Sequence, residues 1–228
     1  MKRILHFLKR SFVLLFWLHL FYIVILKWIY PPITVTQVVS IAEGHGLKRD
    51  YTSHHNISSN AKLAVIAAED QLFPDHNGFD WKSIRKAMKY NQRKPGRIRG
   101  ASTISQQVAK NVFLWQGRSW IRKALEAYFT FMIEVLWGKE RILDMYLNVV
   151  EMGEGVFGIE KAANIYFKKP ASQLSRHEAA LIAAILPNPK QYRIRPASSF
   201  VSGRAGAIQR QMSNLQADRD IRRVIGIK

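Results

Sequence analysis

The stretch Ala67–Asp80, AAEDQLFPDHNGFD, ends an alanine-rich run with two adjacent carboxylates, Glu69 and Asp70, and then adds a histidine, a turn and another acid. About thirty residues later comes the nearly uncharged segment GASTISQQ at positions 100–107. Its small residues, hydroxyls and amides are costly to bury without hydrogen-bond partners, and sugars offer such partners. Together the two segments predict a cleft that holds a polar substrate beside a carboxylate able to accept a proton.

The apolar pattern on both sides of these segments predicts a mostly α fold, with two lobes around a groove. We find no internal repeat, and strand-like alternation is confined to short stretches. SRHE at residues 175–178 matches a capping box, which marks the start of a helix. Helices are expected over residues 61–73, 81–90, 102–111, 119–137, 139–148, 159–167, 175–186 and 203–217.

Composition excludes some classes of protein and leaves others open. A chain of 228 residues can bury a proper core, and the absence of cysteine excludes disulfide frameworks and thiolate metal sites. The net charge is +19, and the first 36 residues hold only five of the 35 basic residues, so the remainder is strongly basic too. Such a surface favours nucleic acid, acidic lipid headgroups or phosphorylated substrates, and charge alone does not choose among them.

Residues 11–30 predict a transmembrane anchor. Ser11–Leu26 carries no formal charge, and Trp28 and Tyr30 lie where an aromatic belt is expected, so about 20 residues are available to cross a bilayer. Four basic residues precede the span, which predicts a cytoplasmic segment 1–10 and an exported remainder. No small-x-small cleavage site follows the apolar run, and this disfavours a cleaved signal peptide. We expect a polar connector over residues 31–60 and a basic C-terminal tail over 219–228.

The two acids acquire different expected roles from their surroundings. Adjacent acids on a helix are usually solvated surface charges. Here the preceding alanines and the helix C-terminus both disfavour an ionised carboxylate, so the pKa of Glu69 should rise towards the range of a general base. Asp70 is expected to brace the site through hydrogen bonds or an ion pair. His76 is expected to be a structural hydrogen-bonding residue beside the turn.

A basic cluster follows the polar segment. Lys110, Arg118, Arg122 and Lys123 occur at helical or near-helical spacing, which fits either a phosphate clamp or a solvated basic face. Glu126 lies one turn beyond Arg122. It is therefore either a second functional acid or one half of a helix-stabilising ion pair.

Several motifs occur in one order: EDQLFPDHNGFDW, GASTISQQVAKN, RKALE at 122–126, KERILDMYLN at 139–148, GVFGIEKAANIYFKK and HEAALIAAILPNPKQY. Over about residues 45–215 the chain closely resembles the peptidoglycan glycosyltransferases, specifically the monofunctional biosynthetic transglycosylases of Gram-negative bacteria. Ala101 and Asp144 depart mildly from the family pattern. The resemblance implies a lysozyme-like helical domain, placed at residues 61–218, with a small membrane-proximal lobe and one preceding transmembrane helix.

The resemblance also implies a reaction. The growing glycan, α-linked to undecaprenyl diphosphate, is transferred with inversion to the 4-hydroxyl of lipid II, which forms β-1,4 linkages. Glu69 would be the base, and Lys110, Arg118 and Arg122 match phosphate-binding positions. Glu126 matches a second essential glutamate, and the resemblance leaves open whether it holds a divalent cation (Mg²⁺ or Mn²⁺) or assists the leaving group. No organic cofactor is expected. Further substrate contacts are assigned to Asp70, Ser102, Thr103, Gln106, Gln107 and Lys123.

The implied setting is the bacterial inner membrane, with the catalytic domain in the periplasm. Partners would be lipid II, the growing strand, the anionic membrane surface and proteins of cell division or elongation, without nucleic acid. The helix at 81–90 fits either insertion into an anionic leaflet or ordinary packing on the core. Two other functions stay open: a lytic transglycosylase or muramidase, and a non-enzymatic membrane-anchored basic scaffold.

Overall fold

The computed structural model describes residues 2–94, 96, 100–117 and 119–227. Within this part the fold is mostly α, as predicted, and two very short strands, β1 (Lys48–Arg49) and β2 (Val156–Phe157), pair in parallel. The helices are α1 (Lys2–Ile25), α2 (Val35–Ala42), α3 (Ser59–Glu69), α4 (Trp81–Arg93), α5 (Ile104–Phe113), α6 (Trp120–Leu136), α7 (Lys139–Val149), α8 (Ile159–Phe167), α9 (Arg176–Ile185), α10 (Ser199–Leu215) and α11 (Arg219–Ile225).

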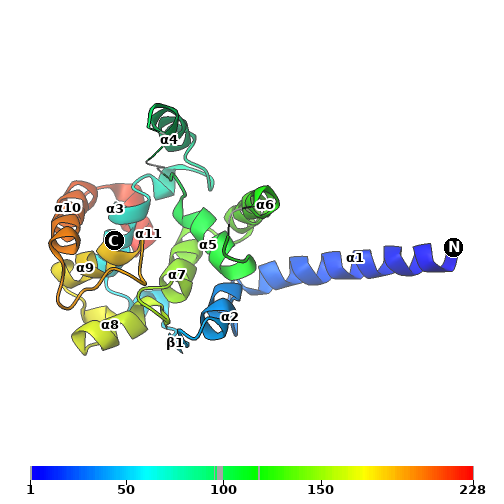
Figure 1. Ribbon diagram of the computed structural model, residues 1–228, viewed down its shortest axis with the longest axis horizontal. Coiled ribbons are helices and arrows are strands. Elements are labelled where there is room, and N and C mark those ends of the chain that lie inside the picture. Colours follow the sequence, from blue (N-terminus) through cyan, green and yellow to red (C-terminus); the bar gives the residue numbers. More distant parts are fainter. Residues whose placement is uncertain (1, 95, 97–99, 118, 228) are drawn as a thin grey trace.

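Two groups of helices form the body (Figure 1). In one group α3, α9 and α10 pack on one another, and in the other α5 packs against both α6 and α7. Every residue of α3 from Ala61 to Ala67 is buried, because this helix is enclosed by its neighbours and its alanines allow close approach. The carboxyl end of α3 therefore delivers Glu69 to the place where the two groups meet.

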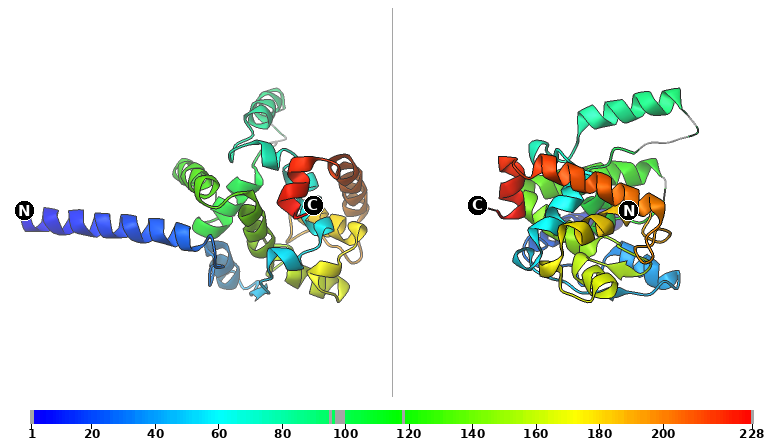
Figure 2. Two further views of the ribbon diagram at one scale, coloured as in Figure 1. Left: turned by 180° about the vertical axis from the view of Figure 1, so that it is seen from behind. Right: turned by 90° about the vertical axis from the view of Figure 1, so that its left-hand side faces the viewer.

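Helix α1 projects away from the body as a single long rod (Figures 1 and 2). Residues Arg3–Ile25 are long and apolar enough to cross a membrane, and almost none of the span is buried inside the protein. The helix begins nine residues before the predicted span 11–30 and ends five residues before its end. The early basic residues contain no helix breaker, whereas residues 26–28 already form the turn that leads to two prolines.

The end of α1 is firmly attached to the body. Ile23 and Leu26 are fully buried, and the Trp137 indole donates a 2.8 Å hydrogen bond to the Ile23 carbonyl. Just beyond the helix, the Tyr30 hydroxyl donates to the Asp144 carboxylate at 2.8 Å, and Arg141 pairs with the same carboxylate. The anchor thus continues into the core instead of hanging on a free linker.

The segment expected as a polar connector, residues 31–60, is structured instead. It contains α2, which opens with a capping box between Thr34 and Gln37, and its polar residues Thr36, Gln37 and Ser40 are buried. Helix α2 packs on α5, and β1 pairs with β2. The composition of the segment was polar because these side chains serve caps and buried hydrogen bonds, so composition was a poor guide here.

The segment expected as a basic tail, residues 219–228, also differs from the expectation. Its residues 219–225 form α11, which turns Ile221, Val224 and Ile225 inward while the arginines stay outside. The Ile225 carbonyl accepts a 3.1 Å hydrogen bond from the buried ammonium of Lys62. Helix α10 likewise begins before the expected residue 203, because Ser198 caps it.

Helix α4 stands apart from the helical body (Figure 2). Asp80 caps it by accepting the Ser83 amide, as predicted, and only Ala87 along its length is buried. Trp81 and Met88 are both more than half exposed. Ordinary packing on the core therefore does not account for the apolar residues of this helix.

Candidate active site

The Glu69 carboxylate lies at the last residue of α3 and faces side chains from two other helices. Its Oε2 accepts a 2.9 Å hydrogen bond from the Gln107 amide of α5, and its Oε1 lies 3.5 Å from the Arg204 guanidinium of α10. Burial raises the pKa of Glu69 above its ordinary value, while Gln107, Arg204 and Lys110 partly oppose that shift. The geometry presents a carboxylate that is poised to take a proton.

A cavity of about 890 Å³ opens beside Glu69. Of the site residues predicted from the sequence, it brings together Glu69, Asp70, Ser102, Thr103 and Gln107. Its remaining walls come from α4, the residues that follow α3, and α10, and they include the cations Lys86 and Arg204. The cavity is not lined by Gln106 or by the predicted phosphate-binding residues of α5 and α6.

Asp70 binds the protein itself. Its two carboxylate oxygens lie 3.0 and 3.1 Å from His76 Nε2, and Oδ2 also accepts the Ile104 amide at the start of α5. An acid at a helix N-terminus is favoured by the helix dipole, so this bond stabilises the first turn of α5. Asp70 therefore braces the junction between α3, the following turn and α5. Asp70 also lines the cavity, and its predicted contact with substrate stays a prediction.

The middle of the GASTISQQ segment is a helix cap. Thr103 Oγ1 accepts a hydrogen bond from the backbone N–H of Gln106, and Gln106 Oε1 accepts one from the backbone N–H of Thr103. The two bonds complete a capping box. The Thr103 hydroxyl also donates a 2.7 Å bond to the Gly78 carbonyl. Gly78 has a φ of 87°, and a Cβ there would lie 2.6 Å from Thr130 Cγ2, so only glycine fits. Thr103 and Gln106 thus have structural roles in the cap, and their predicted substrate contacts stay predictions. Ser102 is exposed at the cavity.

A second charged cluster lies on α5 and α6, and we call Lys110, Arg122, Lys123 and Glu126 the cationic cluster. Arg122 Nη1 lies 2.7 Å from Glu126 Oε2, and the Lys123 ammonium pairs with Oε1 of the same buried carboxylate. Burial lowers the pKa of Lys110, and electrostatic interactions with Glu126 and Glu69 oppose that shift. Lys110 is therefore within the field of both acids. Arg118, predicted to bind phosphate, lies outside the described residues.

The residues around Glu126 do not fit a divalent metal. Both of its carboxylate oxygens are already bound to cationic side chains. Mg²⁺ and Mn²⁺ prefer several oxygen ligands, and among the described residues no group of three or more histidines and acids could hold an ion. The donor set here repels a cation and suits an anion.

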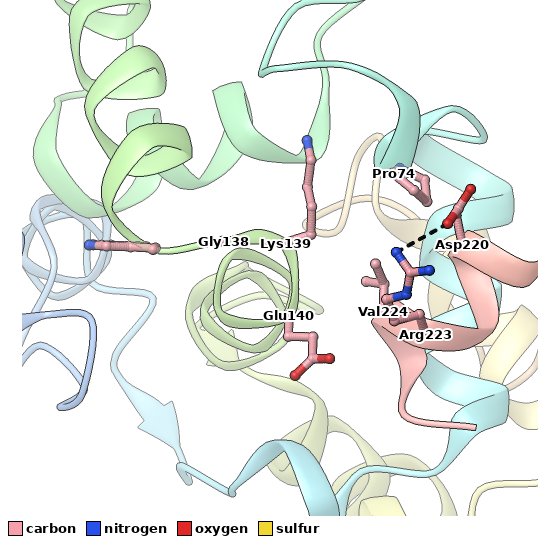
Figure 3. A pocket seen from close by; sticks show the side chains of 8 residues that line it. Pro74, Gly138, Lys139, Glu140, Asp220, Arg223 and Val224 are labelled. Atoms are coloured by element: carbon pink, nitrogen blue, oxygen red, sulfur yellow. Dashed lines mark ion pairs between the residues drawn. The ribbon is translucent and has the colours of Figure 1, made fainter. Parts of the chain in front are cut away.

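Another cavity, of about 400 Å³, lies between the start of α7 and α11 (Figure 3). Three of its charged residues are in ion pairs: Asp220 lies 3.3 Å from Arg223, and Lys139 lies 2.7 Å from Glu134. Glu140 points away from this pair in Figure 3. Both acids that line this cavity, Glu140 and Asp220, are exposed, so neither is a shielded carboxylate of the kind found at Glu69.

Sequence reasoning missed two residues that contact the site. Arg204 comes 135 positions after Glu69, and no spacing rule links them. Tyr146 was visible only as an aromatic residue in KERILDMYLN, although its hydroxyl reaches Gln107 at 3.2 Å. The one signal available was that a tyrosine in an apolar helical stretch carries a hydroxyl that needs a partner when it is buried.

Comparison with known proteins shows the family to which this chain belongs. A family model described as "Transglycosylase" matches residues 36–213. The chain belongs to that family. The matched range extends from α2 into α10, so it includes Glu69, the cationic cluster and Arg204.

Three relatives share at least half of their aligned residues with this chain. All three carry the name "Biosynthetic peptidoglycan transglycosylase". One from Mannheimia succiniciproducens is 52% identical over 181 residues, which covers 79% of this chain and 74% of the relative. One from Escherichia coli is 58% identical over 166 residues, covering 73% and 69%. One from Pseudomonas entomophila is 50% identical over 199 residues, covering 85% and 84%.

Proposed function

We propose that this transglycosylase polymerises the glycan chains of peptidoglycan. It would transfer the growing undecaprenyl-diphosphate-linked glycan to the 4-hydroxyl of lipid II, with inversion, to form a β-1,4 linkage and release undecaprenyl diphosphate. The observation that carries the proposal is the largely buried Glu69 carboxylate beside a large polar cavity, with Lys110 interacting electrostatically with both Glu69 and Glu126. The names of the relatives, which are biosynthetic peptidoglycan transglycosylases, support it.

Glu69 is the proposed general base. A hydroxyl is a poor nucleophile at neutral pH, so the 4-hydroxyl must lose its proton as its oxygen bonds to the anomeric carbon. The raised pKa of Glu69 improves its basicity, and Gln107 holds one carboxylate oxygen while the other faces the cavity near Arg204. The proton passes to Glu69, and the glycosidic electron pair leaves with the diphosphate.

The cationic cluster is the proposed site for that diphosphate. Negative charge grows on the leaving group in the transition state, and cations fixed in advance stabilise it without reorganisation. Glu126 holds Arg122 and Lys123 in place through its two oxygens. The Arg122 Nε–H is buried without a hydrogen-bond partner, which is consistent with a missing acceptor. The donors around Glu126 do not fit a divalent metal, so the cationic side chains are the proposed source of this stabilisation.

Membrane attachment suits a substrate with a prenyl tail. Helix α1 would anchor the chain in the inner membrane, with residues 1–10 in the cytoplasm and the body in the periplasm. Trp81 and Met88 of α4 are exposed on a basic helix, which suits contact with anionic lipid. The outer face of α6 adds exposed Trp120, Phe131 and Val135.

The alternative functions leave either the cationic cluster or the Glu69 carboxylate without a role. A lytic transglycosylase or muramidase also needs a glutamate, but glycan cleavage releases no diphosphate, so the cationic cluster would have no role. A basic scaffold would have no use for a buried carboxylate beside a cavity. Burying Glu69 has a cost in stability, and catalysis explains why that cost is tolerated.

The test incubates the purified full chain in detergent with labelled lipid II and separates any polymer by size. Wild type should give polymer, and Glu69→Gln essentially none. Glu178→Gln is the matched control: Glu178 lies on α9 in a capping box that accepts glutamine equally well, so this variant should polymerise normally. Undiminished polymer from Glu69→Gln would remove Glu69 as the base. Lysis of preformed cell wall without polymer would favour the lytic alternative.

A further inference from the structure

We propose that Tyr146 is a positioning residue for the reaction, because its hydroxyl fixes the Gln107 amide that in turn orients the Glu69 carboxylate. The inference rests on the proposed function, in which Glu69 is the base. Tyr146 lies on α7 and is completely buried, so it does not touch the cavity itself. Its effect on the reaction must pass through Gln107.

The contacts form a chain with a defined direction. The Tyr146 hydroxyl donates to Gln107 Oε1 at 3.2 Å, and Gln107 Nε2 donates to Glu69 Oε2 at 2.9 Å. A glutamine amide can turn over by half a rotation, and its two ends differ in hydrogen-bonding character. Because the Tyr146 hydroxyl is a donor, it favours the amide orientation in which Gln107 Oε1 faces it. The N–H end is then left to face the carboxylate.

Tyr146 is well suited to hold this orientation. Its ring is fully buried in the close-packed core, so it has little freedom to move. Burial raises the pKa of the Tyr146 hydroxyl well above its ordinary value, and the charges of Glu69 and Asp70 add to that shift. The hydroxyl therefore remains a donor throughout the pH range in which the enzyme works.

A role in packing alone would not need the hydroxyl. Phenylalanine would fill the same space, and a buried hydroxyl is stabilising only when it finds a partner. Removing it leaves Gln107 Oε1 without its donor, so the amide is free to rotate away from Glu69. Glu69 would then lose the hydrogen bond that lowers its pKa, and the pKa would rise further.

The experiment compares the pH dependence of polymerisation in Tyr146→Phe and wild type. We expect kcat to fall about tenfold, which corresponds to roughly 1.4 kcal/mol, with KM for lipid II within about twofold. The acid limb of the rate profile should move to higher pH. Tyr166→Phe is the control, since it removes a hydroxyl that donates to the Met152 carbonyl at 2.9 Å, away from the cavity. It should leave the limb in place.

A double mutant separates action through Gln107 from a general effect on the fold. In a Gln107→Met background, Tyr146→Phe should change neither kcat nor the acid limb any further. The positioning role would be overturned if the losses of kcat in the two single variants multiplied in the double mutant. It would also be overturned if the acid limb of Tyr146→Phe did not move. If Tyr146→Phe does not fold, Gln107→Met alone must still move the limb upward, and an unmoved limb overturns the proposal.

The same assay distinguishes failure of this inference from failure of the proposed function. If Glu69→Gln is inactive and the limb of Tyr146→Phe is unmoved, only the positioning role is lost. If Glu69→Gln polymerises as well as wild type, the base assignment falls, and the role of Tyr146 falls with it.

Discussion

Replacing Glu126 by glutamine tests whether this residue holds the cationic cluster together. The substitution keeps the volume of the side chain and removes a negative charge that faces three cations. The Glu126 side chain is 4% exposed and that of Arg122 is 12% exposed, so their 2.7 Å pair is shielded from water. Without Glu126, the buried positive charge of Arg122 loses its ion-pair partner, and Lys110 keeps only its interaction with Glu69.

The structure sets the size of the effect. Removing one partner of a buried ion pair costs about 3–5 kcal/mol. Lys123 is nearly half exposed and stays hydrated when its partner is lost, so we expect the lower end, about 3 kcal/mol. For a domain of this size each kcal/mol lowers Tm by about 2–4 °C, which gives a fall of roughly 6–12 °C.

The assay is thermal unfolding of the full chain in detergent, followed by circular dichroism, with and without inorganic pyrophosphate. Pyrophosphate restores negative charge to the cluster, so it should stabilise Glu126→Gln more than wild type and narrow the gap in Tm by about half. Glu134→Gln is the matched control, because Glu134 lies on the same helix and is buried beside Lys139 at 2.7 Å. The Tm of Glu134→Gln should also fall, and pyrophosphate should not restore it. A Glu126→Gln variant as stable as wild type, or equal recovery of both variants, would refute the reasoning.

Two further predictions concern Glu69. Its folded pKa lies above the ordinary value of 4.5, so the stability it contributes is present below about pH 4.5 and is lost as pH rises through the raised pKa. Glu69→Gln should therefore unfold at a higher temperature than wild type at pH 7, with a gap that closes towards pH 4.5; equal Tm values at pH 7 would contradict this. Arg204→Met removes a charge that lowers the pKa of Glu69, so the acid limb of polymerisation should move to higher pH, and an unmoved limb would show that the 3.5 Å pair has no influence.

Local signals in the sequence were sufficient for much of the fold. Helix α8 begins and ends at the expected residues, and the capping box at Ser175 is confirmed. Periodicity and capping act over a few residues, so one sequence contains them. The different surroundings of Glu69 and Asp70 could be inferred in the same way, from the alanines before them and the turn after them.

Other features depend on contacts that a single sequence does not display. The polar residues Thr103 and Gln106 suggested substrate contacts, yet their partners are each other and Gly78. The capping box between Thr34 and Gln37 formed no part of the prediction, which took the segment as a connector from its polar composition. Arg204 reaches Glu69 only because α10 packs on α3, which is a property of the tertiary fold.

The placement of Lys110 links the two halves of the proposed reaction. Its ammonium interacts electrostatically with Glu69 on one side and with Glu126, Arg122 and Lys123 on the other. A diphosphate bound at the cationic cluster would neutralise cations that otherwise lower the pKa of Glu69, so the base would be stronger while the donor is bound. Departure of the diphosphate restores those positive charges and lowers the pKa again, which helps Glu69 to release the proton it has gained. One largely buried lysine thus couples the state of the leaving-group site to the basicity of the carboxylate, as a contribution smaller than those of burial, Gln107 and Arg204.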